Sequence, residues 1–180
     1  MPNWCNNTIT IRGSVETLSE LKSVVEAGEG LLQAIKPMPK ELEGTTAPSD
    51  SPNWYDWCVA NWGTKWDPEV HLEFTDHGDG TAEITGWFDT AWSPPIEAFN
   101  TLAGDWDSCY VELYYHESGM CFVGYWDSEG ADDHYEYDGA TSDTVRNMIP
   151  EYLVDEFALD EQLAEYEDEE DLTDLSPNML

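Results

Sequence analysis

The segment Val70-His-Leu-Glu-Phe-Thr-Asp-His-Gly-Asp-Gly-Thr-Ala-Glu-Ile-Thr-Gly86 decides the fold of this chain. Apolar and polar residues alternate on both sides of a glycine-rich centre, a pattern typical of a β-hairpin with one buried face. We expect a three-residue loop at His77-Gly78-Asp79. That loop places Val70, Leu72 and Phe74 on the same sheet face as Ala82, Ile84 and Gly86.

Three elements precede this hairpin. Residues 5–12, Cys-Asn-Asn-Thr-Ile-Thr-Ile-Arg, alternate in the same way and predict a strand that ends at Gly13. Ser14 is a suitable N-cap for a helix ending near Gly28, with an apolar stripe of Val15, Leu18, Leu21, Val24 and Val25. The polar residues 44–53 predict a loop, and the aromatic-rich residues 54–66 predict a short helix that closes at Gly63.

A second helix and a second hairpin follow. Ser93-Pro94-Pro95 predicts a helix start with serine as the cap, and Gly104 predicts its end. Residues 109–117 and 120–126 then predict two strands paired across Ser118-Gly119, which sets Cys121 opposite His116. This pairing places five apolar side chains on one face: Val111, Leu113, Tyr115, Phe122 and Trp126.

The order of these elements is β-α-β-β-α-β with one additional strand. It predicts the α+β class, as a ferredoxin-like split β-α-β sandwich whose antiparallel sheet carries helices on one face and ends in an extra edge strand. We expect this domain to span residues 1–126. Residues 127–180 predict an acidic, mostly helical extension docked on it, because apolar residues from Val145 to Tyr166 recur at helical spacing. Pro150 kinks this stretch or starts a new helix.

Charge excludes several classes of function. The 180 residues contain 39 Asp and Glu but 6 Lys and Arg, for a formal net charge of −33. Such a surface repels nucleic acid and anionic lipid, so we expect no direct nucleic-acid or membrane binding. The beginning of the chain lacks the features of a signal peptide, which predicts a soluble, cytoplasmic protein. The 41% hydrophobic content argues against disorder.

No motif for catalysis or for metal or cofactor binding is evident. The four histidines lack metal-ligand spacing, and no nucleophile elbow or phosphate-binding loop occurs. Calcium loops centred on Gly80 or Gly139 lack essential ligands. Cys5, Cys58, Cys109 and Cys121 form no Cys-x-x-Cys pair, so we expect reduced, small core residues. We therefore predict no enzyme activity, no catalytic residues, no metal site and no cofactor.

The tryptophans of residues 54–66 have two interpretations. Trp54, Trp57, Trp62 and Trp66 are suited to cover one side of the sheet as core residues. Exposed tryptophans would instead stack on a ligand or anchor a partner.

The acidity also has two explanations: adaptation to high salt, or imitation of a polyanion. Spread evenly over about 8,800 Å² of folded surface, the charge is too dilute to imitate DNA. Residues 151–174, however, hold 12 acidic residues and no basic residue. One continuous helix there would span about 36 Å, with roughly one carboxylate per 3 Å. We predict that a partner contacts the acidic residues of this helix: Glu151, Asp155, Glu161, Glu165, Asp168, Glu169 and Asp171.

Four stretches resemble a known family. They are Met1-Pro-Asn-Trp-Cys-Asn6, Lys36-Pro-Met-Pro39, Asn61-Trp-Gly-Thr-Lys-Trp-Asp67 and Thr90-Ala-Trp-Ser-Pro-Pro95. Together they are similar to the YubB ferredoxin-like domain proteins of phages and conjugative plasmids. The resemblance covers about residues 1–126 and implies a ferredoxin-like fold and a mobile-element origin. It implies no activity or catalytic residues, and the acidic extension lies outside it.

These observations lead to three functional hypotheses. The first is a non-enzymatic, phage-encoded protein of the host cytoplasm that mimics nucleic acid. Its partner would be a host nucleic-acid-binding protein with a basic groove, such as a restriction or CRISPR-type defence factor. The second is a phage structural or accessory protein whose charge reflects a saline environment. The third is a ligand-binding module that uses the tryptophans of residues 54–66.

Overall fold

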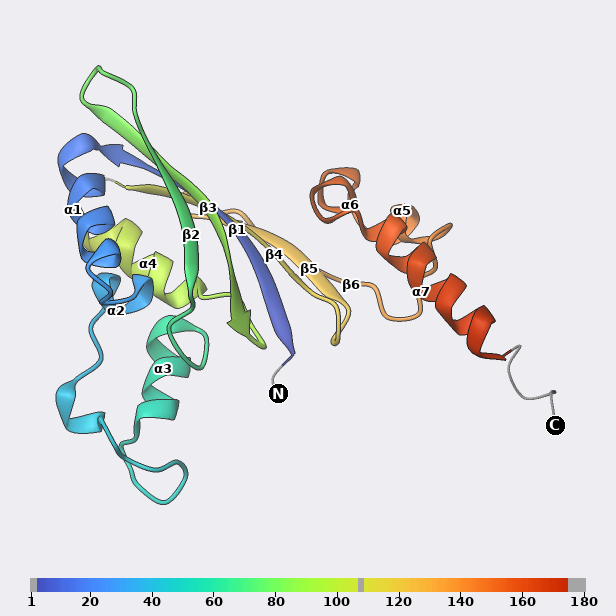
Figure 1. The fold of residues 1–180 in the computed structure, drawn as a ribbon, viewed down its shortest axis with the longest axis horizontal. Coiled ribbons are helices and arrows are strands. Elements are labelled where there is room, and N and C mark those ends of the chain that lie inside the picture. The colour runs from blue at the N-terminus through green and yellow to red at the C-terminus, as the bar shows by residue number, and fades with distance from the viewer. Residues whose placement is uncertain (1–2, 107–108, 175–180) are drawn as a thin grey trace.

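A six-stranded antiparallel sheet runs through the protein (Figure 1). The computed structural model describes the backbone of residues 3–106 and 109–174, and the side chains of that range up to residue 169. The sheet order is β2-β3-β1-β4-β5-β6. In chain order the elements are β1 (Trp4–Ser14), α1 (Val15–Glu26), α2 (Leu31–Ile35), η1 (Lys40–Leu42), α3 (Trp54–Trp62), β2 (Val70–Asp76), β3 (Thr81–Ala91), α4 (Ile96–Asp105), β4 (Tyr110–Glu117), β5 (Phe122–Asp127), β6 (Asp132–Glu136), α5 (Val145–Met148), α6 (Glu151–Phe157) and α7 (Leu159–Asp174).

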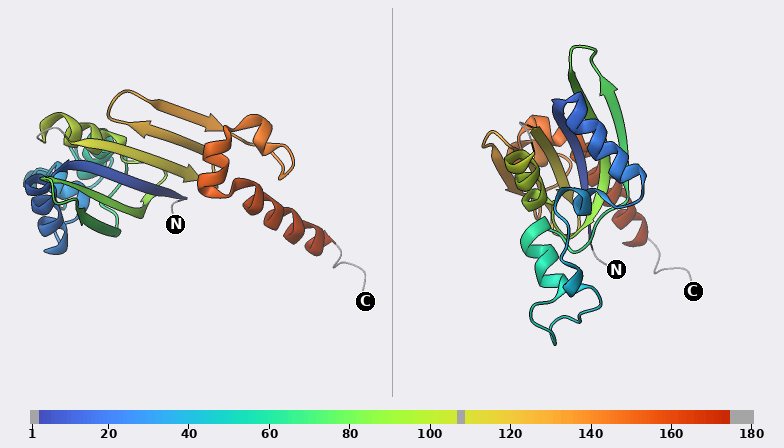
Figure 2. Two further views of the ribbon diagram at one scale, coloured as in Figure 1. Left: turned by 90° about the horizontal axis from the view of Figure 1, so that it is seen from above. Right: turned by 90° about the vertical axis from the view of Figure 1, so that its left-hand side faces the viewer.

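The first four strands, with α1 and α4, form the predicted ferredoxin-like arrangement. Helices α1 to α4 cover one face of the sheet (Figures 1 and 2). Ile9, Ile84 and Leu113 of the sheet are fully buried there, with Leu18 of α1 and Phe99 of α4 in the same core. Burial of each such side chain stabilises the fold by about 1.5–3 kcal/mol. The predicted fold class is therefore confirmed.

The start of α1 agrees with the prediction, whereas the start of α4 differs from it. Ser14 Oγ accepts a hydrogen bond from Thr17 N at 3.1 Å and caps α1. Helix α4 begins at Ile96 after Pro95 and has no side-chain cap. The expected cap, Ser93, donates its hydroxyl to the Gly63 carbonyl at 2.6 Å instead. The serine thus joins the ends of α3 and β3 rather than a helix N-terminus.

The first hairpin has the predicted face but a different register. Phe74 pairs with Ile84 and Leu72 with Gly86, so the apolar sets do share one face. The loop, however, is Gly78-Asp79-Gly80, one residue later than predicted. Asp76 accepts a hydrogen bond from Gly78 N, and both glycines have positive φ. Because glycine tolerates positive φ, the loop forms where two glycines are available.

The second hairpin shows the same kind of shift. Glu117 pairs with Phe122, and His116 faces Val123 rather than the predicted Cys121. The turn spans residues 118–121, since the Glu117 carboxylate accepts hydrogen bonds from the backbone N–H groups of Gly119 and Met120. The five apolar side chains predicted to share a face do so, because the shift is by two residues. Cys121 lies half-buried in this turn and is not a core residue, unlike the buried Cys5, Cys58 and Cys109.

The sheet continues beyond residue 126. Strand β6 pairs with β5 from Trp126↔Asp132 to Phe122↔Glu136, within the segment predicted to be mostly helical. Its residues, Asp-Asp-His-Tyr-Glu, lack a buried alternating face, so no sequence pattern signalled a strand. Helical structure starts at Val145, and α5 to α7 lie on the side of the sheet opposite to α1 to α4 (Figure 1).

Candidate functional site

A second, smaller core attaches the C-terminal helices to the sheet. Val123 of β5 and Tyr137 lie in it with Val145, Ile149 and Leu153, and all five are buried. Tyr114 of β4 and Tyr125 of β5 pack around this cluster. The apolar residues of α5 and α6 thus cover the β4–β5–β6 half of the second face. Among the elements that the structure describes, no helix lies over the other half of that face, β1 to β3 (Figure 2).

The predicted continuous acidic helix is wrong. Ala158 adopts a left-handed conformation with φ 48° and ψ 46°, which ends α6 and starts α7 in a new direction. Leu153 and Val154 before the break and Leu159 after it all reach the same core. A straight helix would place only one stripe of side chains against that core, so burial of these residues favours the break.

Polar contacts hold α7 at two places, its first turn and its middle. The Arg146 guanidinium forms ion pairs with Asp155 at 2.9 Å and with Asp160 at 2.8 Å. Ser142 donates both its backbone N–H and its hydroxyl to the Glu167 carboxylate, at 2.9 and 2.7 Å. These contacts lower the pKa of the Asp160 and Glu167 carboxyls, through Arg146 and Ser142 respectively. No local sequence pattern indicates these anchoring roles, because each contact joins residues at least nine positions apart.

The predicted contact residues fall into two groups. Glu151 and Asp155 are exposed on α6, and Asp155 is already paired with Arg146. Glu161, Glu165, Asp168 and Glu169 are exposed on α7. The four-residue spacing of Glu161, Glu165 and Glu169 sets them in one row along α7. The side chain of Asp171, in the last turns of α7, lies outside the described residues.

Helix α7 projects away from the sheet (Figures 1 and 2). Nine of its 16 residues are acidic and none is basic. Over a length of about 24 Å this is roughly one carboxylate per 3 Å, comparable with the 3.4 Å spacing of phosphates along a DNA strand. The break at Ala158 therefore shortens the continuous acidic helix, but the number of carboxylates per unit length of helix is not lower.

The tryptophans of residues 54–66 have different environments. Trp62 is buried in the first core, and Trp54 and Trp57 pack against it, as the core interpretation predicts. Trp66 is half-buried and contacts Trp4, at 6.4 Å between ring centroids. Beside it, the Lys65 ammonium lies 4.6 Å from the Trp66 ring centroid and 4.9 Å from that of Trp92. Some tryptophans of this segment thus belong to the core, and Trp66 forms part of a partly exposed aromatic surface.

Residues of the stretches that resemble a known family hold the fold together. Asn7, directly after the first stretch, is buried and donates to Cys5 O, Phe88 O and Thr90 Oγ1. Thr64 Oγ1 donates to Ala91 O at 3.0 Å. The Asp67 carboxylate accepts hydrogen bonds from the backbone of α2, and burial raises its pKa although these donors oppose the shift. These side chains therefore have structural partners.

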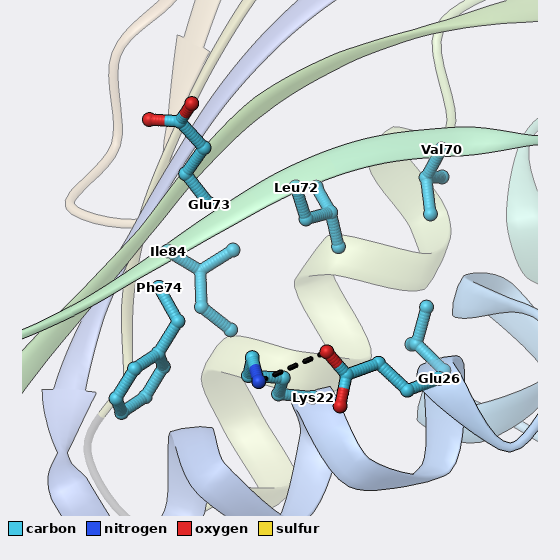
Figure 3. A pocket seen from close by; sticks show the side chains of 8 residues that line it. Lys22, Glu26, Val70, Leu72, Glu73, Phe74 and Ile84 are labelled. Atoms are coloured by element: carbon cyan, nitrogen blue, oxygen red, sulfur yellow. Dashed lines mark ion pairs between the residues drawn. The ribbon is translucent and has the colours of Figure 1, made fainter.

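A hollow of about 200 Å³ lies between α1 and the edge strand β2 (Figure 3). Val70, Leu72 and Phe74 form its apolar wall. Its two charged groups on α1, Lys22 and Glu26, pair with each other at 2.9 Å. Glu73 also belongs to the lining, but its side chain points away from this pair in Figure 3. The hollow is a gap in the packing at the edge of the sheet, and its two charged groups on α1 are already paired with each other.

Buried polar groups elsewhere are few. His116 Nε2 lies 2.6 Å from the Tyr137 hydroxyl, and burial lowers the pKa of His116 to about 4. Within the described part of the chain, no three His, Cys, Asp or Glu side chains are placed to hold a metal ion. No helix in that part is long and apolar enough to cross a membrane.

Sheet order and helix placement define a ferredoxin-like α+β protein. The profile of the family described as a ferredoxin-like domain in Api92-like proteins matches residues 61–171. Because the match covers more than half of the sequence, the chain belongs to this family. The matched range includes β6, α5, α6 and most of α7. The acidic extension is therefore part of the family's domain, although the resemblance seen in the sequence stopped at residue 126.

One solved structure is similar to this chain: the crystal structure of the protein Api92 from Yersinia pseudotuberculosis. Sequence identity is 18% and the TM-score is 0.40. The similarity covers 61% of this chain and 40% of that chain, so this chain spans less than half of that protein. No curated protein matches the chain.

Proposed function

We propose that this protein is a non-enzymatic binding protein that imitates nucleic acid. Its partner is a host protein with a basic nucleic-acid-binding groove, such as a restriction or CRISPR-type defence factor, which it blocks in the host cytoplasm. The resemblance to phage and plasmid proteins supports a mobile-element origin.

The observation that carries this proposal is the exposed acidic helix α7. A helix that served only to complete the core would turn an apolar face to the sheet along its whole length. In α7, only Leu159 is buried among the described side chains, and every one from Glu165 to Glu169 is exposed. Like charges four residues apart each cost about 0.2–0.5 kcal/mol of helix stability. Keeping Glu161, Glu165 and Glu169 in one row favours a role for the charge itself.

The body of the protein is less suited to this role. On the open sheet face, Arg12 pairs with Glu83 at 2.8 Å and with Glu112 at 2.9 Å, which neutralises part of the local charge. On α7 beyond Asp160, no described carboxylate has a cationic partner. Apart from Asp160, which pairs with Arg146, and Glu167, which accepts hydrogen bonds from Ser142, the described carboxylates of α7 are thus free to replace phosphates against lysine and arginine side chains.

A charge-reversal variant tests the proposal. The full-length protein is first used to capture a partner from host lysate at about 0.1 M salt. The dissociation constant of the purified partner is then measured in competition with labelled duplex DNA. The variant replaces Glu161, Glu165, Asp168 and Glu169 with lysine. We expect it to lose binding, because four attractive contacts become repulsive, and we expect the native affinity to fall steeply at about 0.5 M salt.

The matched control replaces four exposed glutamates of the body, Glu20, Glu29, Glu41 and Glu43, with lysine. Both variants change the formal net charge from −33 to −25, so a loss confined to the α7 variant identifies that helix as the contact surface. Equal affinity of native protein and α7 variant, or a partner that DNA does not displace, would contradict mimicry. Those results would favour the alternative, an accessory protein with charge set by a saline environment.

A further inference from the structure

A second surface, distant from α7 in the sequence, has the chemistry of a binding site. A hollow of about 320 Å³ lies at the end of the sheet where β1 and β2 begin and β3 ends. Its lining includes four aromatic side chains, Trp4, Trp66, His71 and Trp87, and three carboxylates, Asp67, Glu69 and Asp89. Three separate strands and the loop before β2 contribute these residues, so the hollow exists only in the folded chain.

Aromatic rings form the walls of this hollow in two pairs. His71 and Trp87 stack with centroids 4.1 Å apart and an interplanar angle of 21°. Trp4 and Trp66 lie 6.4 Å apart in a tilted arrangement. Trp87 is 54% exposed and Trp4 is 45% exposed. Large aromatic rings kept at the surface around a hollow are typical of a contact site for another molecule.

The carboxylates of the hollow differ in how they are used. Both oxygens of Asp67, at the edge of the hollow, accept backbone hydrogen bonds from Leu32 and Gln33 and serve the fold. Asp89 Oδ1 accepts a hydrogen bond from Asn6 Nδ2 at 2.7 Å, while its Oδ2 has no partner among the described residues. Glu69 is exposed and likewise unpaired within that part of the chain. Two carboxylates therefore face an aromatic hollow whose lining contains no lysine or arginine.

We infer that this hollow binds the guanidinium group of an arginine side chain presented by a partner protein. A cation within about 6 Å of an indole ring is attracted to its face, and the planar guanidinium also stacks on it. Carboxylates provide the hydrogen-bond acceptors that a guanidinium requires. The neighbouring Lys65 ammonium already lies over the Trp66 ring, so the rings available to an added cation are those of the more exposed Trp4 and Trp87.

The shape of the hollow favours a side chain over a free small molecule. A small-molecule site encloses most of its ligand, whereas here two of the surrounding tryptophans are about half exposed. The net charge of −33 also draws basic partners to the surface. This inference does not rest on the proposed role of α7, because none of the lining residues belongs to that helix.

The test is a titration of the full-length protein, labelled with 15N at the tryptophan indoles, with N-acetyl-arginine amide at about 0.15 M salt. The Trp87 indole signal is identified as the one missing from the spectrum of Trp87→Leu. We expect this signal to shift when the native protein is titrated. The variant Trp87→Leu should weaken binding by about 3- to 30-fold, the range expected for a cation–π contact. Glu69→Gln, which leaves every ring in place, should also weaken it.

The controls separate this site from general attraction to an acidic protein. Tyr166→Leu removes an aromatic side chain of similar exposure, 58%, from α7 without changing charge, and should leave the affinity unchanged. N-acetyl-citrulline amide, a neutral analogue of the probe, should not bind. Equal binding of the citrulline analogue, or unchanged affinity in Trp87→Leu, would overturn the inference. Tighter binding of choline at the same indoles would overturn the arginine assignment in favour of a small quaternary ammonium ligand.

Discussion

Replacement of His116 by glutamine is expected to change how the stability of this protein depends on pH. His116 is 1% exposed, and its ring lies 5.3 Å from that of Phe157 and 5.9 Å from that of Tyr137. Its Nδ1 has no hydrogen-bond partner among the described residues. Burial without a counter-charge favours the neutral ring, which lowers the pKa of His116 to about 4.

The sign of the effect follows from proton uptake. In the unfolded chain the histidine pKa is about 6.5, so between pH 6.5 and pH 4 the unfolded state binds a proton that the native state does not. The contribution of His116 is fully present above pH 6.5 and decreases as the pH falls toward 4. Between pH 7.5 and pH 4.5 the native protein should lose about 2–3 kcal/mol of unfolding free energy through this group.

Urea denaturation followed by far-ultraviolet circular dichroism at pH 7.5, 6.5, 5.5 and 4.5 measures this loss. His116→Gln removes the titrating group, so the stability advantage of the native protein over the variant should shrink by that amount as the pH falls. His77→Gln, in the exposed turn between β2 and β3, is the matched control. Carboxylate titration is common to all three proteins and cancels in the comparison. A difference between native and His116→Gln protein that stays constant within about 0.5 kcal/mol would refute the reasoning.

Three further predictions test the fold. Asn7→Ala leaves the buried acceptors of β1 and β3 without their donor and should cost about 1–3 kcal/mol of unfolding free energy; a neutral effect in urea denaturation would contradict this. Ala158→Gly replaces a residue whose left-handed conformation is strained and should raise the free energy of unfolding by about 1 kcal/mol. Ala164→Gly, within α7, should lower the free energy of unfolding by about 1 kcal/mol. A change of the same sign in both variants would refute the helix break at Ala158. Arg146→Gln removes two exposed ion pairs and should lower the free energy of unfolding only slightly, with a smaller loss at about 0.5 M salt; a large, salt-independent loss would contradict this.

Local patterns determined the strands and the helices α1, α3 and α4 of the first 126 residues. Alternation with period two revealed both hairpins, and their inner faces are as predicted because a shift of two residues keeps every side chain on its face. The cap at Ser14 and the end of α3 at Gly63 were readable, because each depends on residues within one turn of helix.

The exact registers depended on interactions that periodicity does not encode. Carboxylates of Asp76 and Glu117 accept hydrogen bonds from turn backbone groups, and these turns set the pairing two residues away from the predicted one. At the beginning of α2, the backbone N–H of Leu32 donates a hydrogen bond to the carboxylate of Asp67, which lies 35 residues later in the chain. Strand β6 exists because the edge of β5 offers partners for its backbone, not because its own residues favour a strand.

The candidate sites show the same division. Sequence alone determined that the C-terminal segment is acidic and that its part from Val145 onward is helical, since charge and helical spacing are local properties of the chain. Tertiary structure decided that the helix breaks at Ala158, because residues on both sides of the break are buried in one core. It also decided that Trp4, His71 and Trp87 share a hollow. Strands far apart in the sequence are adjacent in the sheet, so their exposed side chains meet only after the chain has folded.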